Sequence, residues 1–258
     1  MSGLVEQVSK SPPRTLNEGS MDANKDFSRL IRWCVGLPIV LDDAYIIEGG
    51  TLSRIMQTGR PEWWDDAVTH LSKDPLLGRI VESYGKEGLS GRGEIFQTLV
   101  RSIIGQQISV KAADTIHGRL KELCGDINRK SISSCTPDEM SSCGLSQQKI
   151  LYIHGIATNG DPLLPEGYEE LDDDSIVKHL VKFKGVGPWT AEMMLIFSLM
   201  RPDVLSLGDL GVVKGIQGLA PEAFTKEEMR AVAEAWRPYR SAACWFLWRS
   251  LDPVPVEY

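Results

Sequence analysis

Metal-binding cysteine spacings are missing from this 258-residue sequence. Its five cysteines are scattered, and no two of them form a CxxC pair. The odd number argues against a disulfide framework, and the missing pair argues against a zinc ribbon or an iron–sulfur loop. The four histidines show no ligand spacing with cysteines or acids, so we expect no transition-metal site and a reducing, intracellular compartment.

Long apolar runs are missing as well. No run approaches the roughly 18–20 residues that span a bilayer, and the N-terminal stretch MSGLVEQVSKSPPRTLNEGS lacks the apolar centre of a secretory signal. We therefore expect no membrane partner. The apolar fraction of 42% is still ample for a hydrophobic core.

Excess basic charge is also missing, because the net charge is −7. Taken alone, this counts against nucleic acid as a partner, since binding phosphates requires a basic surface. The charge is unevenly spread, however. Residues 161–175 contain acids and no lysine or arginine, whereas residues 176–189 contain three lysines and no acid. The mean charge therefore says little about any one surface.

The pattern of the chain changes along its length. Residues 1–26 are polar with paired prolines, which predicts disorder. Residues 27–61 are mixed, and LPIVLDDAYII within them fits a strand or a hairpin. Helical patterns dominate residues 62–258, so we expect one mainly α domain there, with little or no β structure near the N-terminus.

Several helices have readable ends. The apolar residues between positions 95 and 104 fall on one helical face. Ser109 and Ser146 are placed to cap the helices that follow them. Thr136 and Thr225 each stand three residues before a glutamate, which is the spacing of a capping box. Together these signals predict a succession of short helices joined by brief loops.

The stretch FKGVGPWTAEMM predicts a tight corner between two helices. Gly185 is expected to end the first helix, and Gly187 with Pro188 to begin the second. Trp189 and Met193 then lie one turn apart on one face of the second helix. This arrangement is a helix–hairpin–helix, in which the glycines let another backbone come close.

Such a corner suits an anion. The second helix begins with unpaired N–H groups and the positive end of its dipole, which favour a phosphate. Main-chain contacts carry no base-sequence information, so they suit a protein that scans any DNA. The lysines just upstream, Lys182 and Lys184, add positive potential. The plain alternative is that Gly185 and Gly187 only cap helices, as is common for an isolated GxG.

FKGVGPWTAEMM followed by RPDVLSLGDLGVVKG resembles the signature of the helix–hairpin–helix (HhH-GPD) DNA glycosylase superfamily. Within it, the chain resembles the alkylated-base branch, of the 3-methyladenine DNA glycosylase II type. The blocks IIGQQISVKAAD, GLSQQKILYI and WRPYRSAACWFLW match further parts of that branch in the same order. The resemblance covers roughly residues 62–252 and implies a two-lobed helical bundle.

The resemblance also implies a function in base excision repair. The chain would be a monomer that binds double-stranded DNA containing damaged bases, flips out an alkylated base of the 3-methyladenine or 7-methylguanine type and hydrolyses its N-glycosidic bond. Its place would be the nucleus in a eukaryote, or the cytoplasm and nucleoid in a bacterium. No cofactor would be required.

Asp209 matches the catalytic aspartate of the family. Breaking the bond passes through an oxocarbenium-like transition state, which a fixed carboxylate stabilises. An alkylated purine already carries positive charge, so a strong general acid is not needed. Without the resemblance, Asp209 would be read as the N-cap of a helix that begins at Leu210, and both roles can coexist. Asp203, the other nearby acid, fits a turn.

Other site residues follow from the same resemblance. Trp189 occupies the slot in which bifunctional relatives carry a nucleophilic lysine, so we expect a monofunctional enzyme that leaves an abasic site. Trp189 and Trp248 match aromatic positions of the base pocket, and Met193 matches another lining position. Gln107 matches the side chain that fills the gap in the duplex; the alternative is a glutamine that satisfies its own loop.

The hairpin residues Gly185, Val186 and Gly187, together with Lys184, are the expected DNA contacts. Family members often bind a monovalent cation at the hairpin through main-chain carbonyls. The matching positions here are Val181, Phe183 and Val186, which would hold sodium or potassium. Carbonyl ligands leave no side-chain pattern in a sequence.

Two alternatives remain open at this point. One is an enzyme of the same superfamily with another lesion preference, such as an oxidised or deaminated base. The other is a non-catalytic helix–hairpin–helix protein that only binds DNA. Asp209 and Trp189 argue against the second alternative, since a protein that only binds DNA needs neither.

Overall fold

The computed structural model describes residues 39–42, 45–48, 51–54, 58–92 and 95–252. The chain divides into two compact units, residues 1–55 and residues 56–258. The disorder predicted for residues 1–26 lies outside the described residues. The predicted helical domain, residues 62–258, falls within the second unit, which we call the helical unit.

The first unit contains a small antiparallel sheet. Its strands are β1 (Ile39–Asp42), β2 (Tyr45–Glu48) and β3 (Thr51–Arg54), and they pair in the order β1-β2-β3. In the register of β2 and β3, Tyr45 lies opposite Arg54. Of the two readings of LPIVLDDAYII, the hairpin is therefore the one found, since β1 and β2 pair antiparallel within it.

The helical unit carries nearly all the regular structure. Its α-helices are α2 (Trp64–Leu71), α3 (Gly78–Tyr84), α4 (Ile95–Gly105), α5 (Val110–Cys124), α6 (Arg129–Ser134), α7 (Pro137–Ser142), α8 (Gln147–Thr158), α9 (Asp173–Leu180), α10 (Pro188–Phe197), α11 (Leu210–Leu219), α12 (Lys226–Ala233) and α13 (Arg240–Leu251). Its described residues also form two 3₁₀ turns, η1 (Tyr168–Glu170) and η2 (Glu234–Trp236), and a short pairing of β4 (Thr58–Gly59) with β5 (Gly91–Arg92). The predicted mainly α fold is confirmed. Among the described residues, no helix has the length and apolar character to cross a membrane.

Local capping explains where many of these helices begin. The hydroxyls of Ser109 and Ser146 accept main-chain N–H groups at the starts of α5 and α8. Thr136 and Thr225 form complete capping boxes at the starts of α7 and α12. Each cap satisfies donors that a helix leaves unpaired at its first turn. The starts predicted from the sequence are thus found in the structure.

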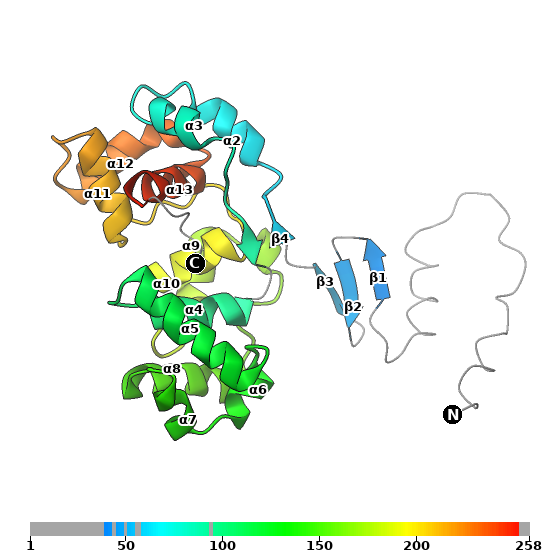
Figure 1. The fold of residues 1–258 in the computed structure, drawn as a ribbon. Coiled ribbons are helices and arrows are strands. Elements are labelled where there is room, and N and C mark those ends of the chain that lie inside the picture. Colours follow the sequence, from blue (N-terminus) through cyan, green and yellow to red (C-terminus); the bar gives the residue numbers. More distant parts are fainter. Residues whose placement is uncertain (1–38, 43–44, 49–50, 55–57, 93–94, 253–258) are drawn as a thin grey trace, which may run out of the picture. The chain divides into compact units, whose positions relative to one another are not determined.

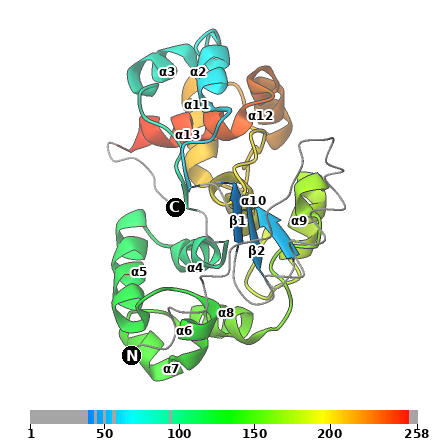
Figure 2. The same cartoon turned by 90° about the vertical axis from the view of Figure 1, so that its right-hand side faces the viewer.

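The helices form two lobes, as Figure 1 and Figure 2 show. The hairpin lobe contains α4 to α10, and the C-terminal lobe contains α2, α3 and α11 to α13. Most residues of α10 in the hairpin lobe and of α13 in the C-terminal lobe are buried, and we call these two the central helices. A helix that is apolar on every side belongs in a core. The predicted two-lobed bundle is confirmed.

Glycines bring α11 close to α13. A Cβ atom on Gly215 would lie 2.8 Å from the Cβ atom of Leu247, and one on Gly211 would lie 2.8 Å from Cδ1 of Trp248. Gly211 and Gly215 are one turn apart, so they form one side-chain-free stripe. The two helices approach along this stripe, and any larger side chain would push them apart.

We predict that Gly215→Ala destabilises the protein, because the new methyl group overlaps Leu247. Overpacking of this kind costs about 1–3 kcal/mol, which the better helix propensity of alanine offsets by about 1 kcal/mol. Gly218→Ala on the same helix is the matched control, since nothing lies within 4 Å of its Cβ position. Urea denaturation measures both. Equal stability of the two variants would contradict the packing described here.

Candidate active site

A cavity of about 740 Å³ lies between the two lobes of the helical unit. Residues of α4, α5 and α10 line it from the hairpin lobe, and residues of α11 and α13 line it from the C-terminal lobe. The segment that joins α10 to α11 ends at Asp209 in the wall of this cavity. The site therefore depends on how the lobes meet.

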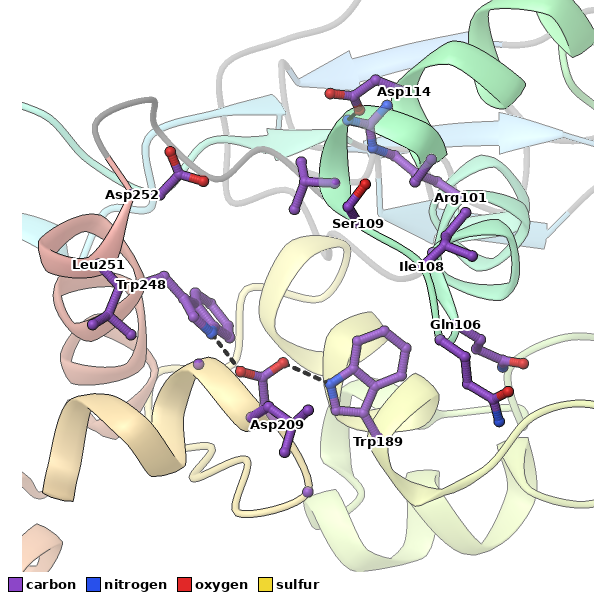
Figure 3. A pocket seen from close by; sticks show the side chains of 17 residues that line it. Arg101, Gln106, Ile108, Ser109, Asp114, Trp189, Asp209, Trp248, Leu251 and Asp252 are labelled. Atoms are coloured by element: carbon purple, nitrogen blue, oxygen red, sulfur yellow. Dashed lines mark hydrogen bonds and ion pairs between the residues drawn. The ribbon is translucent and has the colours of Figure 1, made fainter.

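The carboxylate of Asp209 is buried and accepts three hydrogen bonds. Its Oδ1 accepts the N–H of Val212 over 2.9 Å and the indole Nε1–H of Trp248 over 2.8 Å. Its Oδ2 accepts the indole Nε1–H of Trp189 over 2.9 Å. Figure 3 shows the two indoles reaching the carboxylate from either side. Asp209 is also the N-cap of α11, so the same side chain caps a helix and lines the cavity.

The two indoles come from the two central helices. Trp189 stands in the first turn of α10, is partly buried and lines the cavity. Trp248 stands near the end of α13, is buried, and stacks on Phe197 with the ring centroids 5.7 Å apart. Each ring therefore offers its N–H edge to Asp209. The sequence led us to expect ring faces in a pocket. In the structure the same two side chains also donate hydrogen bonds to Asp209.

Gly211 makes the contact between Trp248 and Asp209 possible. A Cβ atom there would lie 2.8 Å from Cδ1 of Trp248 and 3.0 Å from Oδ1 of Asp209. Gly211 is not among the site residues predicted from the sequence. Its signal was present as the second glycine of the string GDLG, two residues after the aspartate, but a glycine in the first turn of a helix has many uses.

The loop that follows α4 is held in an uncommon conformation. Gln107 is exposed and has a φ of 61°, which non-glycine residues rarely adopt. Gln106 Nε2 donates to the carbonyl of Gly185 over 2.9 Å, and Lys149 Nζ donates to the carbonyl of Gln106 over 2.9 Å. Burial lowers the pKa of Lys149. These contacts tie the loop to α8 and the hairpin and leave Gln107 at the rim of the cavity.

The prediction that Gly185 ends the first helix of the hairpin was wrong. The first helix of the pair, α9, ends at Leu180 and not at Gly185, because a short turn intervenes. Gly185 has a φ of 93°, and a Cβ atom there would lie 2.3 Å from the ring of Tyr152. The N-cap of α10 is Gly187, as predicted, and nothing lies within 4 Å of its Cβ position. Gly185 therefore makes room for Tyr152, whereas Gly187 faces open space.

A second depression, of about 720 Å³, lies over this hairpin. Gly185, Val186 and Gly187 line it, and it shares Gln107 and Trp189 with the first cavity. The structure thus brings together Asp209, Trp189, Trp248 and Gln107 in one cavity and the three hairpin residues in the next.

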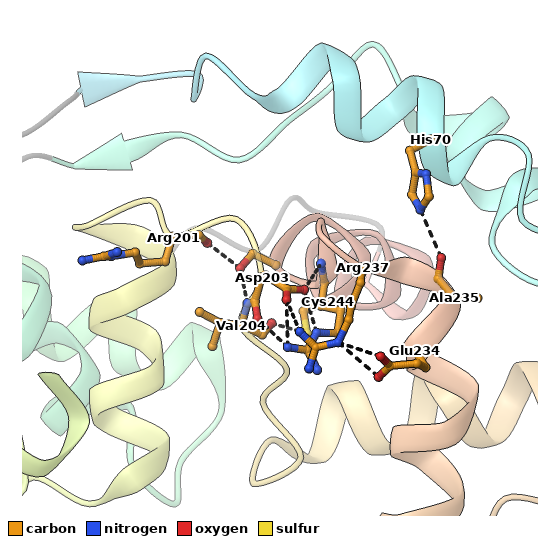
Figure 4. A network of polar contacts seen from close by, with 10 residues as sticks. His70, Arg201, Asp203, Val204, Glu234, Ala235, Arg237 and Cys244 are labelled. Carbon is orange, nitrogen blue, oxygen red and sulfur yellow. Dashed lines mark hydrogen bonds and ion pairs between the residues drawn. The ribbon is translucent and has the colours of Figure 1, made fainter. Parts of the chain in front are cut away.

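Three of the residues considered from the sequence lie elsewhere. Met193 is fully buried in the core and does not line the cavity, although it stands one turn after Trp189. Lys184 is exposed and lines neither depression. Asp203 belongs to a polar network (Figure 4), in which it accepts Arg240 Nε over 2.7 Å and Arg237 over 2.6 Å. That network holds the start of α13 and has no part in the cavity.

A family model described as "HhH-GPD superfamily base excision DNA repair protein" matches residues 100–238, which is more than half of the chain. The chain belongs to the HhH-GPD superfamily. The matched residues include the loop with Gln107, the hairpin and Asp209, so the cavity of this superfamily member is built largely from the matched segment.

Individual relatives of this HhH-GPD protein are 3-methyladenine glycosylases. DNA-3-methyladenine glycosylase 1 of Schizosaccharomyces pombe is 30% identical over 80% of this chain and 89% of its own. The solved structure of the S. pombe 3-methyladenine DNA glycosylase in complex with abasic DNA has a TM-score of 0.64 and 31% identity, and the match covers 72% of this chain and 96% of that one. A DNA-3-methyladenine glycosidase from Bacillus halodurans has a TM-score of 0.57 and 32% identity, covering 70% and 87%.

We predict that the indole N–H resonances of this HhH-GPD protein report the three-donor site. Asp209→Asn leaves one oxygen, which Val212 and Trp248 both require, and turns an amide donor toward Trp189. In a ¹H–¹⁵N spectrum the Trp189 indole signal should therefore move upfield the most. The signals of Trp64 and Trp236 are internal controls, because their buried Nε1 groups have no hydrogen-bond partner among the described residues. Unmoved signals from both Trp189 and Trp248 would rule out the contacts.

Proposed function

We propose that the protein is a monofunctional DNA glycosylase that removes alkylated bases of the 3-methyladenine and 7-methylguanine type. It hydrolyses the N-glycosidic bond and leaves an abasic site for base excision repair. The observation that carries the proposal is the buried Asp209 carboxylate, fixed by two indoles in the wall of a cavity of about 740 Å³. The printed names of the relatives support the same activity.

Asp209 supplies the electrostatic part of the reaction. As the bond to the base lengthens, positive charge develops on the sugar, and a carboxylate already in place stabilises it without further reorganisation. The hydrogen bonds from Trp189, Trp248 and Val212 hold that orientation before the substrate enters. A water molecule on the same side of the sugar as the carboxylate then attacks the sugar and completes the hydrolysis.

The lining of the cavity favours a base that is already cationic. The described residues that line it include three acidic residues, Asp114, Asp209 and Asp252. They include one basic residue, Arg101, which pairs with Asp114 over 2.6 Å. The excess of negative charge attracts a cation. The described lining contains no histidine, lysine or tyrosine, so a neutral base would find few candidates for a general acid. A cationic alkylpurine leaves without one.

The same lining supports monofunctional chemistry. Strand cleavage of the bifunctional kind needs an amine that attacks the sugar. Trp189 stands in the slot where that lysine would be, and no lysine is among the described lining residues. The ring of Trp189, partly buried and directed into the cavity (Figure 3), instead offers a surface on which the flipped base stacks.

The hairpin is the proposed grip on the DNA backbone. The main-chain N–H groups at the start of α10 donate to a phosphate oxygen without reading a base. Nothing lies within 4 Å of the Cβ position of Gly187 at this helix start, so the DNA backbone has room to approach. Lys184 is exposed in the same hairpin segment and adds positive potential. Gln107 projects from its strained loop at the rim of the cavity and fills the space that the flipped nucleotide leaves. Such an enzyme works where the genome is, in a nucleus or in a bacterial cytoplasm.

The carbonyls of Val181, Phe183 and Val186 are proposed to hold a sodium or potassium ion. The chemistry of these donors fits a weakly bound alkali cation, since carbonyl oxygens suit hard ions and the hairpin supplies them from one short segment. The Phe183 carbonyl already accepts the Val186 N–H over 3.0 Å and keeps a second lone pair. When bound, the ion would neutralise phosphate charge at the hairpin.

We predict that the protein releases 3-methyladenine and 7-methylguanine from methylated duplex DNA, and that Asp209→Asn slows this release about 100- to 1,000-fold. The reason is the loss of the carboxylate that the two indoles orient. Chromatography of the free bases under single-turnover conditions measures the rate. Binding of the variant to abasic DNA serves as the control for its fold.

The product strand gives a second control in the same experiment. It should break only after hot alkali, because an abasic site and not a nick is the expected product. No base release by the native protein would overturn the proposed function. Equal release by the Asp209→Asn variant would remove Asp209 from the chemistry, and breakage without alkali would contradict the monofunctional assignment.

A further inference from the structure

A second carboxyl group, that of Glu192, contacts the segment that carries Asp209. The hydroxyl of Ser206 donates to Oε2 of Glu192 over 2.5 Å. The main-chain carbonyl of the same serine accepts the N–H of Asp209 over 3.1 Å. Ser206 is fully buried. One residue thus connects the two acids, through its side chain to Glu192 and through its main chain to Asp209.

Glu192 and Trp189 lie three residues apart on α10, so they project from neighbouring positions of one helical face. Trp189 contacts the far end of the segment at Asp209, and Glu192 contacts it three residues earlier at Ser206. The turn between these points, residues 206–209, is therefore attached to α10 at both ends. A turn fixed at two points leaves its carboxylate little freedom.

The carboxyl group of Glu192 is partly buried, which is costly for an acid. Burial raises the pKa of Glu192, and the nearby Asp209 carboxylate acts in the same direction. The Ser206 hydroxyl and the Lys226 ammonium group oppose that rise. Burying a charged group is costly unless it is paired and hydrogen-bonded. The only hydrogen bond described for this carboxyl is the one to the turn that carries Asp209.

We propose that Glu192 is a positioning residue of the glycosylase reaction: it accepts the Ser206 hydroxyl and so fixes the turn that sets Asp209 between the two indoles. This inference rests on the proposed function. Glu192 is not among the described residues that line the cavity, so it acts through Ser206 and not on the substrate. To hold the Ser206 hydroxyl, the Glu192 side chain needs an acceptor oxygen and not a negative charge.

The test compares Glu192→Ala, Glu192→Gln and Ser206→Ala with the native protein. Two quantities are measured: the single-turnover rate of 3-methyladenine release and the affinity for abasic DNA. Loss of the acceptor in Glu192→Ala should slow release about 10- to 100-fold, because a small displacement of a catalytic group has effects of that size. Glu192→Gln keeps an acceptor and should stay within about threefold of the native rate. Affinity for abasic DNA should change less than about twofold in all three.

Ser206→Ala removes a single oxygen atom and should reproduce the effect of Glu192→Ala. The double variant should be no slower than the slower single variant, since both remove one and the same hydrogen bond. Glu227→Ala, which removes an exposed acid of α12, is the matched control and should leave the rate unchanged.

Three outcomes would overturn the inference. They are a native rate in Glu192→Ala, equal losses in the alanine and glutamine variants, and additive losses in the double variant. If Glu192→Ala lost affinity for abasic DNA, the release rate of Ser206→Ala would be the test instead. A native rate in Ser206→Ala would then overturn the inference. A native protein that releases no base would contradict the proposed function instead, so the two failures are distinguishable.

Discussion

The carboxylate of Asp209 lies where the two lobes of the helical unit meet, and it is shared between them. The central helix of the hairpin lobe reaches one oxygen through Trp189, and the central helix of the C-terminal lobe reaches the other through Trp248. A buried carboxylate is tolerated only when donors surround it. The position of the Asp209 carboxylate therefore depends directly on how the two lobes pack against each other.

Much of the surrounding structure serves this contact. The glycine stripe of α11 lets α13 approach closely enough for Trp248 to reach the acid. On the other side, Ser206 and Glu192 hold the turn that leads into α11. The hairpin and the loop with Gln107 are tied to each other through Gln106. Binding of DNA at the hairpin would thus act on elements already connected to the cavity.

Local features of the site could be predicted from the sequence, and tertiary features could not. The helix caps at Ser109 and Ser146 depend on a few neighbouring residues, so the local sequence was sufficient to predict them. Trp189 and Met193 share a helical spacing, yet one reaches the cavity and the other is in the core, because α10 is buried on nearly every side. The contacts of Gly185 with Tyr152 and of Glu192 with Ser206 join segments whose distance in space no local pattern shows.

The most direct test of the shared carboxylate removes the indole N–H groups and keeps the rings. Trp189→Phe and Trp248→Phe each delete one donor to Asp209 while leaving an aromatic face in the cavity. If orientation of the acid is the central requirement, each change should slow 3-methyladenine release about tenfold, roughly the effect of 1.4 kcal/mol, with affinity for abasic DNA nearly unchanged. Native rates in both variants, or a loss of affinity that accounts for the whole effect, would contradict this account.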